Sequence, residues 1–332
     1  MINSKLHLSE KIFDKDIDQV PTRNGYGEGL VVAGEKDERV VALCADLTES
    51  TRTEGFAKKF PERFIEIGVA EQAMATIASG MANYGKIPFI ASYAAFSPGR
   101  NWEQIRTTIA LNDVPVKICG AHAGISVGPD GATHQMLEDI ALMRAMPNMT
   151  VVVPCDSVEA RKATIAAAEN GKPTYLRFGR EKTPVMTGEE TPFEIGKVNI
   201  LWESEDPQFA IVGCGALLYE CLLAVKELEK SHLGGVILNC HTINPIDEGT
   251  IISVARKCGA VVTVEEHQIN GGLGSAVAEV LSRNWPVPIE FIGMPNSFGE
   301  SGKPNELLEK YGMKAKDIIE AVKKVIARKN RD

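Results

Sequence analysis

Long apolar runs are absent from this sequence of 332 residues, and none approaches the roughly 18 residues that a membrane-spanning helix requires. The first residues, MINSKLHLSEKIFDKD, are polar and acidic and have no resemblance to a secretory signal. We therefore expect a cytoplasmic protein that does not have a membrane as its partner.

Paired cysteines and an excess of positive charge are also missing. The seven cysteines form no CxxC pair and most lie in apolar runs such as VVVPC, so we expect buried free thiols and neither zinc ligands nor disulfides. The formal net charge of -8 argues against a surface that neutralises phosphodiester backbones. We therefore expect no nucleic acid partner.

The residues that are present have the composition of an ordinary globular protein, with 44% hydrophobic and 24% charged residues. From about residue 23, short β-branched runs alternate with helical patterns. Strands are expected at 39–45, 64–68, 87–92, 114–122, 149–155 and 173–178, and helices at 24–35, 71–84, 101–111, 134–146 and 157–170. This alternation predicts a parallel sheet that is covered by helices.

The pattern loosens after residue 180 in the segment TPVMTGEETPFEIGKVNILWESEDPQ, where we place a domain junction. A second series follows, with strands expected at 209–215, 235–240, 260–266 and 288–293 and helices at 216–229, 248–257 and 274–283. The fold class is therefore predicted as α/β with two doubly wound domains. We expect the first at 15–188, a linker at 189–207 and a smaller second domain at 208–332.

Two neighbouring segments contain candidate site residues. In FIEIGVAEQAMATIASG, Glu71 follows a strand at the start of a helix of small residues, where an acidic side chain also stabilises the helix dipole without any further role. In IASYAAFSPGRN, Tyr93 and Phe96 lie between a strand and a helix, and a single aromatic there usually fills the core. Only the combination of these residues indicates a site.

The most specific motif is HAGISVGPDGATHQ, which places His122, Asp130 and His134 in one glycine-rich loop. Ligand sites of α/β proteins lie at the carboxyl ends of strands, where this loop is expected. Two histidines and an aspartate also suit a metal, but their spacing is not a standard zinc spacing. Arg23 and Arg180 lie at loop positions, and the arginine fork matches phosphate oxygens.

These segments together resemble the second half of the transketolase family over roughly residues 20–330. The resemblance implies that Glu71 meets N1' of the aminopyrimidine of thiamine diphosphate, that Tyr93 and Phe96 pack on this ring, and that Asp46 lies near the thiamine pocket. A carboxylate at N1' favours the 4'-imino tautomer, which takes the C2 proton of the thiazolium ring. Glu71 is then the residue that activates the cofactor.

The resemblance also assigns the substrate-binding residues. His122, Arg23 and Arg180 then hold the sugar phosphate with the help of Ser50, while Asp130 binds a substrate hydroxyl and His134 lies at the C1 end. Together with Glu71, Asp130 and His134 are the expected catalytic residues. The implied reaction transfers a two-carbon ketol unit from a ketose phosphate to an aldose phosphate, as in the pentose phosphate pathway.

The GDG motif that binds the Mg²⁺ and diphosphate of the cofactor in this family is missing from the sequence. The resemblance therefore implies a split enzyme, in which an N-terminal transketolase subunit binds Mg²⁺ and this chain binds no metal. A homodimer of this chain within an α2β2 heterotetramer is the expected assembly.

Other interpretations stay open at this point. Half of another thiamine enzyme, such as a deoxyxylulose-phosphate synthase or the beta subunit of a 2-oxo acid dehydrogenase, fits less well because of His122 and the two arginines. A non-catalytic binding protein is a third possibility. A nicotinamide dehydrogenase is least supported, because VEEHQINGGLGSAV matches the dinucleotide motif only in part, with Val277 at the last position.

Overall fold

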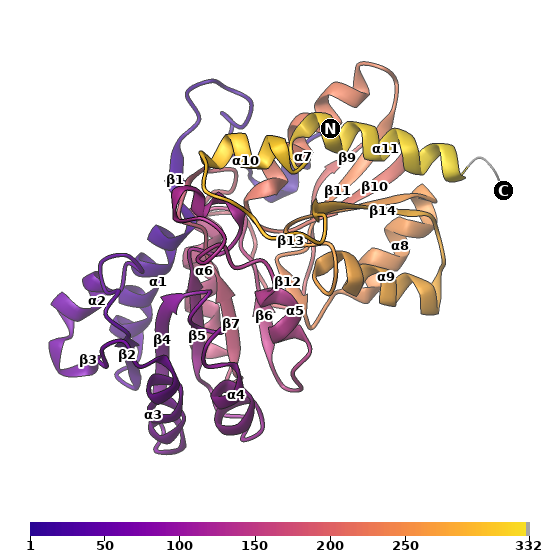
Figure 1. Ribbon diagram of the computed structural model, residues 1–332. Coiled ribbons are helices and arrows are strands. Elements are labelled where there is room, and N and C mark those ends of the chain that lie inside the picture. Colours follow the sequence, from indigo (N-terminus) through magenta and orange to yellow (C-terminus); the bar gives the residue numbers. More distant parts are fainter. Residues whose placement is uncertain (330–332) are drawn as a thin grey trace.

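The first half of the chain forms a seven-stranded sheet in the computed structural model, which describes residues 1–329 (Figure 1). In spatial order its strands are β12 (Thr242–Asn244), β6 (Thr150–Val152), β7 (Thr174–Arg177), β5 (Lys117–Ala121), β4 (Ile87–Tyr93), β2 (Val40–Cys44) and β3 (Phe64–Glu66). All neighbouring strands are parallel except β12, which comes from the second half of the chain and pairs antiparallel with β6.

A second sheet of five strands contains, in spatial order, β14 (Ile289–Met294), β13 (Val261–Gln268), β10 (Pro207–Gly213), β11 (Gly234–Asn239) and β9 (Asn199–Glu203). Only the edge strand β9, which lies in the segment 189–207, is antiparallel. A short pair, β1 (Gln19–Pro21) and β8 (Lys182–Pro184), lies outside both sheets. The predicted α/β fold with two largely parallel sheets is confirmed.

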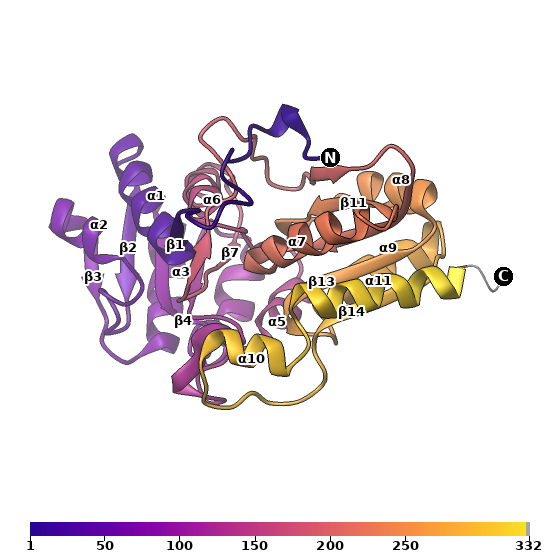
Figure 2. The same ribbon diagram turned by 90° about the horizontal axis from the view of Figure 1, so that it is seen from above.

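Helices cover both sheets (Figures 1 and 2). Those of the first half are α1 (Thr22–Lys36), α2 (Glu54–Lys59), α3 (Glu71–Asn83), α4 (Trp102–Gln104) continuing as a π-helical turn (Ile105–Ala110), α5 (Asp139–Arg144) and α6 (Ser157–Glu169). Those of the second half are α7 (Leu218–Glu229), α8 (Glu248–Cys258), α9 (Leu273–Asn284), α10 (Pro304–Lys310) and α11 (Ala315–Lys329).

The strand β2 shows why helices lie on both faces of the first sheet. Its residues are all buried, and successive side chains of a strand point to opposite faces. Val41 and Leu43 pack with α3, whereas Val40 and Ala42 pack with α1 and α6. A strand buried on both sides therefore needs the continuous apolar run VVALC instead of an alternating pattern.

The helix predicted at 134–146 is wrong in its first half, because α5 begins only at Asp139. The preceding backbone is used in long-range hydrogen bonds: Met136 O accepts from Gly124 N at 2.8 Å and Leu137 O accepts from Gln268 N at 2.9 Å. These bonds replace those that a helix would make. The residues around His134 therefore form a loop.

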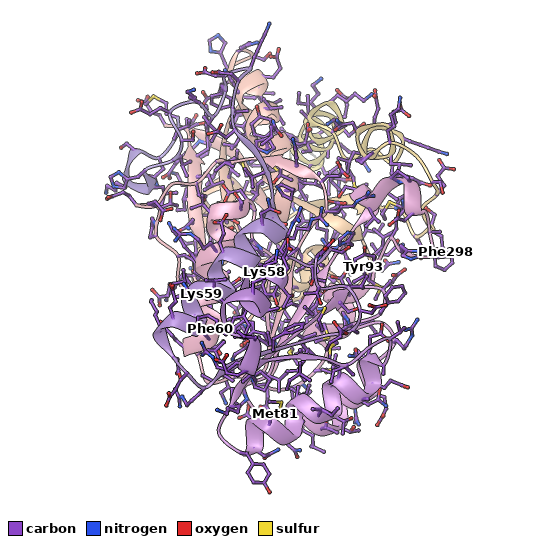
Figure 3. The ribbon with its side chains drawn as sticks, turned by 90° about the vertical axis from the view of Figure 1, so that its left-hand side faces the viewer. Lys58, Lys59, Phe60, Met81, Tyr93 and Phe298 are labelled. Atoms are coloured by element: carbon purple, nitrogen blue, oxygen red, sulfur yellow. The ribbon has the colours of Figure 1, made fainter. Side chains whose placement is uncertain are left out.

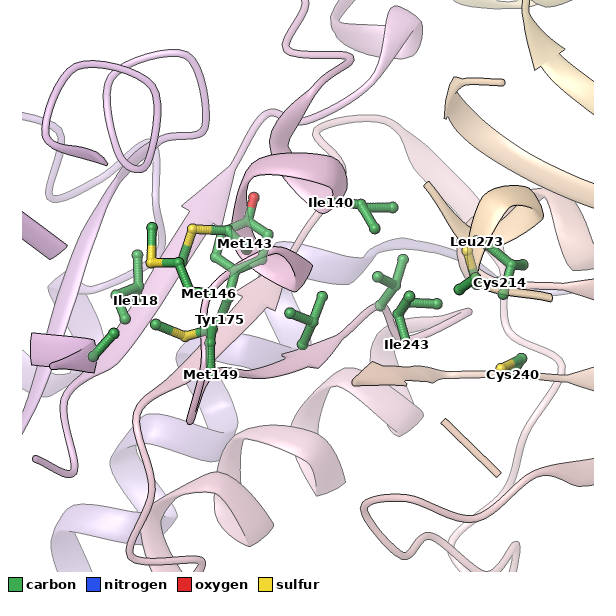
Figure 4. Close-up of a cluster of buried hydrophobic side chains, with 14 of the residues drawn as sticks. Ile118, Ile140, Met143, Met146, Met149, Tyr175, Cys214, Cys240, Ile243 and Leu273 are labelled. Atoms are coloured by element: carbon green, nitrogen blue, oxygen red, sulfur yellow. The ribbon is translucent and has the colours of Figure 1, made fainter. Parts of the chain in front are cut away.

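A single apolar cluster joins the two sheets (Figure 4). Met143, Met146 and Met149 surround Tyr175 on the first sheet, and the cluster continues through Ile243 to Cys214 of the second domain. All seven cysteines are buried and free, as the sequence predicts. None of the helices between residues 1 and 329 combines the length and apolarity needed to cross a bilayer.

Candidate active site

Four neighbouring parallel strands end at the same edge of the first sheet, and a predicted site residue lies at or just after the end of each. Tyr93 is the last residue of β4, and His122 follows β5 directly. Asp46 comes two residues after β2, and Arg180 comes three residues after β7. The carboxyl ends of these strands thus bring together segments that lie far apart in the sequence.

An aromatic cluster forms the centre of this edge. The ring centroids of Tyr93 and His122 lie 3.8 Å apart at an interplanar angle of 24°. Phe96 lies 6.0 Å from Tyr93 and 5.4 Å from His134, which approaches it edge-on. The structure therefore brings together Tyr93, Phe96, His122 and His134. Tyr93 is labelled in Figure 3.

A positively charged group adjoins this cluster. Arg23 Nη1 lies 3.2 Å from His122 Nε2 and donates to Ser50 O at 2.8 Å. Since a guanidinium can only donate, His122 Nε2 must accept, and the ring is neutral with its proton on Nδ1. Burial, together with the charges of Arg23 and Arg180, lowers the pKa of His122 to about 3. His122 is therefore uncharged at neutral pH.

Arg180 completes the positive side of the site. Its Nη1 donates to Val127 O at 2.9 Å and lies 3.7 Å from Asp130 Oδ1. Burial lowers the pKa of Arg23, as do the charges of Arg52 and Arg180. Among the described residues, Arg23 Nε and His122 Nδ1 are buried donors without a hydrogen-bond partner. Such donors favour a ligand with anionic acceptor oxygens.

Glu71 is the first residue of α3 and is buried. Its Oε2 accepts from Arg100 Nη1 at 2.6 Å, and its carbonyl accepts from Asn101 Nδ2 at 3.0 Å. The Arg100 guanidinium also lies 4.8 Å from the centroid of the Phe96 ring. One planar cation thus contacts the Glu71 carboxylate and the face of Phe96 at the same time, so a planar heteroaromatic ring fits the same two residues.

Two residues that the sequence predicts for the site have side chains outside the aromatic cluster. Asp46 is exposed in a left-handed conformation with φ of 59°, and its N–H donates to Glu66 Oε1 at 2.7 Å. Ser50 meets Arg23 through its carbonyl and not through its hydroxyl. Neither side chain joins the aromatic cluster through a contact seen within residues 1–329.

Sequence reasoning missed two arginines. Arg100 lies four residues after Phe96, and this spacing in the turn before α4 could have identified it. Arg52 has a left-handed φ of 69° and its Nε donates to Asn24 Oδ1 at 3.0 Å. It lies in the segment after β2 that also contains Asp46 and Ser50.

Within residues 1–329, no three His, Cys, Asp or Glu side chains are grouped so that they could hold a metal ion. A hollow of about 430 Å³ is lined by Arg39 and Lys86 near the amino ends of β2 and β4. It therefore lies at the opposite edge of the sheet from the candidate site.

Comparison with known protein families identifies both halves of the chain. Residues 18–186 match the model of the pyrimidine binding domain of transketolase, and residues 196–318 match the model of the transketolase C-terminal domain. The first match contains the whole aromatic and charged edge described above.

Individual relatives agree with this division. The chain is 46% identical to a putative transketolase C-terminal section from Methanocaldococcus jannaschii, over 91% of this chain and 96% of the relative. It is 38% identical to a 6-deoxy-6-sulfo-D-fructose transketolase subunit from a Clostridium species, over 96% and 98% of the two chains. Human transketolase is 34% identical over 94% of this chain, which spans 50% of that protein.

A solved structure of a split gene transketolase, described as an inactive beta4 tetramer, superimposes with a TM-score of 0.87 and 42% identity. The superposition covers 93% of this chain and 99% of that one. The chain therefore belongs to the transketolase family, whose members depend on thiamine diphosphate, and it consists of that family's pyrimidine-binding and C-terminal domains.

Proposed function

We propose that this chain is the C-terminal subunit of a split transketolase, which transfers a two-carbon ketol unit from a ketose phosphate to an aldose phosphate. The observation that carries the proposal is the convergence of one buried carboxylate, an aromatic cluster and a group of arginines at a single sheet edge. The proposed domain division is 15–188 and 208–332, and the proposed compartment is the cytoplasm.

Glu71, Tyr93 and Phe96 are the residues proposed to hold the aminopyrimidine. When bound, thiamine diphosphate supplies a carbanion at C2 of its thiazolium ring that can add to a sugar carbonyl. Glu71 is buried at 2% exposure and holds an N–H donor at 2.6 Å, so its carboxylate suits a proton at N1'. The Phe96 ring face already accommodates a planar group at 4.8 Å.

The charged side of the site is proposed to bind the phosphate of the sugar. Arg23 and Arg180 present guanidinium groups that match phosphate oxygens, and neutral His122 lies beside Arg23 with an N–H at Nδ1 that is unpaired within residues 1–329. Asp130 then accepts a hydrogen bond from a substrate hydroxyl, and His134 lies near C1 of the sugar because its ring touches Phe96 at the pyrimidine side. These groups select a substrate with one anionic end.

A partner subunit is proposed to bind Mg²⁺ and the diphosphate, because the sequence has no GDG motif and matches only the second half of the full-length relatives. Four apolar side chains are exposed on and beside α3 and the π-helical turn: Val69, Ile77, Tyr84 and Leu111, at 71%, 43%, 92% and 74%. Large apolar side chains that are exposed in one region suit a protein interface. They support an assembly with further chains, for which we propose an α2β2 heterotetramer containing a homodimer of this chain.

The test combines this chain with a GDG-bearing partner, thiamine diphosphate, Mg²⁺, xylulose 5-phosphate and ribose 5-phosphate, and measures sedoheptulose 7-phosphate. Activity is expected only when both chains are present. Turnover by this chain alone would contradict the split enzyme.

Substitution of Glu71 tests the site itself. We expect Glu71→Gln to abolish most turnover while the subunits still assemble, because an amide cannot provide the anionic acceptor at N1'. Glu62→Gln, at an exposed position before β3, serves as the control. Undiminished turnover of Glu71→Gln would show that the residue was assigned wrongly.

A second candidate reaction uses a sulfonated ketose, which the 38% identity to a sulfofructose transketolase subunit favours. A sulfonate and a phosphate ester each have three terminal oxygens, but the two groups differ in charge at neutral pH. Parallel assays with fructose 6-phosphate and 6-deoxy-6-sulfofructose as donors distinguish the two. A kcat/KM at least tenfold higher for the sulfonated donor would favour the second candidate.

A further inference from the structure

The loop 122–135, which contains His122, Asp130 and His134, is held by residues of the second domain. Glu266 belongs to β13 of the second sheet, and its Oε1 accepts from Ser126 N at 2.7 Å. The two residues are 140 positions apart in the sequence and both are buried. One carboxylate of the second domain therefore fixes the middle of the loop.

Gln135 forms a second connection at the end of the loop. Its Nε2 lies within hydrogen-bonding distance of Glu300 O at 2.9 Å and of Ile125 O and Gly128 O at 3.2 Å each. Glu300 lies in the segment between β14 and α10, and Figure 2 shows α10 beside this part of the loop. A single amide thus joins two points of the loop to the second domain.

The glycines of the loop are required where the second domain approaches. Gly124 and Gly131 have φ values of +90° and +73°, which other residues rarely adopt. A Cβ at Gly124 would lie 2.2 Å from Glu266 Oε1, and one at Gly131 would lie 2.6 Å from Ser301 Oγ. At these two positions the loop therefore approaches the second domain without space for a side chain.

Glu266 places a carboxyl group in a buried contact between the two domains. Burial raises the pKa of Glu266, while the nearby charge of Arg177 opposes this change. Arg177 Nη2 donates to Glu266 O at 2.8 Å and also binds Asp139. Well-packed apolar residues often replace such buried charges without loss of stability. A carboxylate at this position is consistent with a role in holding the Ser126 N–H.

We propose that the second domain positions the substrate loop, and that Glu266 and Gln135 are positioning residues for the reaction. The inference rests on the proposed function, in which this loop binds the sugar. A displacement of about 1 Å in a substrate-positioning group reduces rates on the order of 10²-fold. The second domain would then contribute to substrate binding without touching the substrate.

Hydrogen–deuterium exchange of the isolated chain tests the attachment of the loop. We expect faster exchange throughout 122–135 in Glu266→Ala and near-normal exchange in Glu266→Gln, which keeps an acceptor oxygen. The matched control is Glu265→Ala: this neighbouring buried carboxylate accepts from Leu273 N at 2.7 Å and Gly274 N at 2.8 Å, both in its own domain. Unchanged loop exchange in Glu266→Ala would overturn the proposal.

Kinetics with the partner subunit then test the role in the reaction. For Glu266→Ala we expect KM for the sugar phosphates to rise on the order of tenfold, with cofactor affinity unchanged and recovery in Glu266→Gln. Equal KM changes in Glu265→Ala and Glu266→Ala would indicate a purely structural role and overturn the proposal.

If Glu266→Ala does not fold, Gln135→Leu is used in its place. This variant should give the same increases in loop exchange and in KM. Normal loop exchange and a normal KM in Gln135→Leu would overturn the proposal. A wild-type assembly without activity would instead contradict the proposed function. The exchange experiment still decides the attachment of the loop in that case.

Discussion

At the scale of single residues, Arg100 occupies the contacts that are proposed for the cofactor. Its guanidinium pairs with Glu71 at 2.6 Å and lies 4.8 Å from the Phe96 ring centroid, where the pyrimidine is proposed to bind. The Arg100 side chain is 47% exposed, and half-exposed ion pairs contribute at most about 1 kcal/mol.

We therefore predict that Arg100→Ala tightens thiamine diphosphate binding by up to about fivefold, as calorimetric titration with the partner present would show. Arg106→Ala, in the following π-helical turn, should leave the affinity unchanged. Weaker binding by Arg100→Ala would mean that the guanidinium supports the cofactor.

His122 gives a second prediction at this scale. With its pKa lowered to about 3, it stays neutral over the range of an ordinary assay, and NMR of the ring nitrogens should show no titration between pH 5 and 8. Below about pH 6.5 the unfolded chain binds a proton that the folded chain does not, so stability decreases as the pH falls.

Added phosphate should raise the pKa of His122, because an anion offsets the charges of Arg23 and Arg180. Arg23→Ala should raise it as well, whereas Arg256→Ala, on the second domain, should not. If the His122 ring of the wild type titrated near pH 6.5, the structure of a buried His122 beside Arg23 would be contradicted.

At the scale of secondary structure, a buried ion pair joins α5 to β7. Asp139 accepts from Arg177 Nε at 2.7 Å and from the Tyr175 hydroxyl at 2.7 Å. Burial alone would raise the pKa of Asp139, but Arg177 beside it lowers the value below its usual range. The short helix α5 thus begins at a residue that is fixed by a neighbouring strand.

We predict that Asp139→Ala lowers the free energy of unfolding by about 3–5 kcal/mol, because it leaves Arg177 buried and unpaired. Urea denaturation measures the change. The double variant Asp139→Ala/Arg177→Met should recover part of the loss. The surface pair Asp113 and Lys172 provides the control, and Lys172→Ala should cost less than about 1 kcal/mol.

At the scale of the whole molecule, Glu159 links the two domains. This residue of α6 accepts from Asn239 Nδ2 of β11 at 2.7 Å and from Cys155 N at 2.7 Å. Burial raises the pKa of Glu159 to about 7, and the charge of Asp156 adds to the effect. The stabilisation is complete below the unfolded value of 4.5 and is lost as the pH rises through 7.

The wild-type chain should therefore lose roughly 3 kcal/mol of stability between pH 4.5 and 8 through this group, at about 1.4 kcal/mol for each pH unit of the shift. Urea denaturation of Glu159→Gln should show a flatter dependence on pH. Glu169→Gln, on the same helix but exposed, should match the wild type. If the stability of the wild type, Glu159→Gln and Glu169→Gln depended on pH in the same way, Glu159 would not have the raised pKa on which this prediction rests.

The sequence by itself determined the alternation of strands and helices and the loop motif with His122, Asp130 and His134, because apolar periodicity and glycine spacing are local properties. Only the tertiary structure decided that 134–138 is not helical, that Arg100 binds Glu71, and that Glu266 holds the loop 122–135. Each of these depends on hydrogen bonds between residues 12 to 140 positions apart. A local sequence pattern cannot predict such a hydrogen-bond partner, because only folding brings the two groups together.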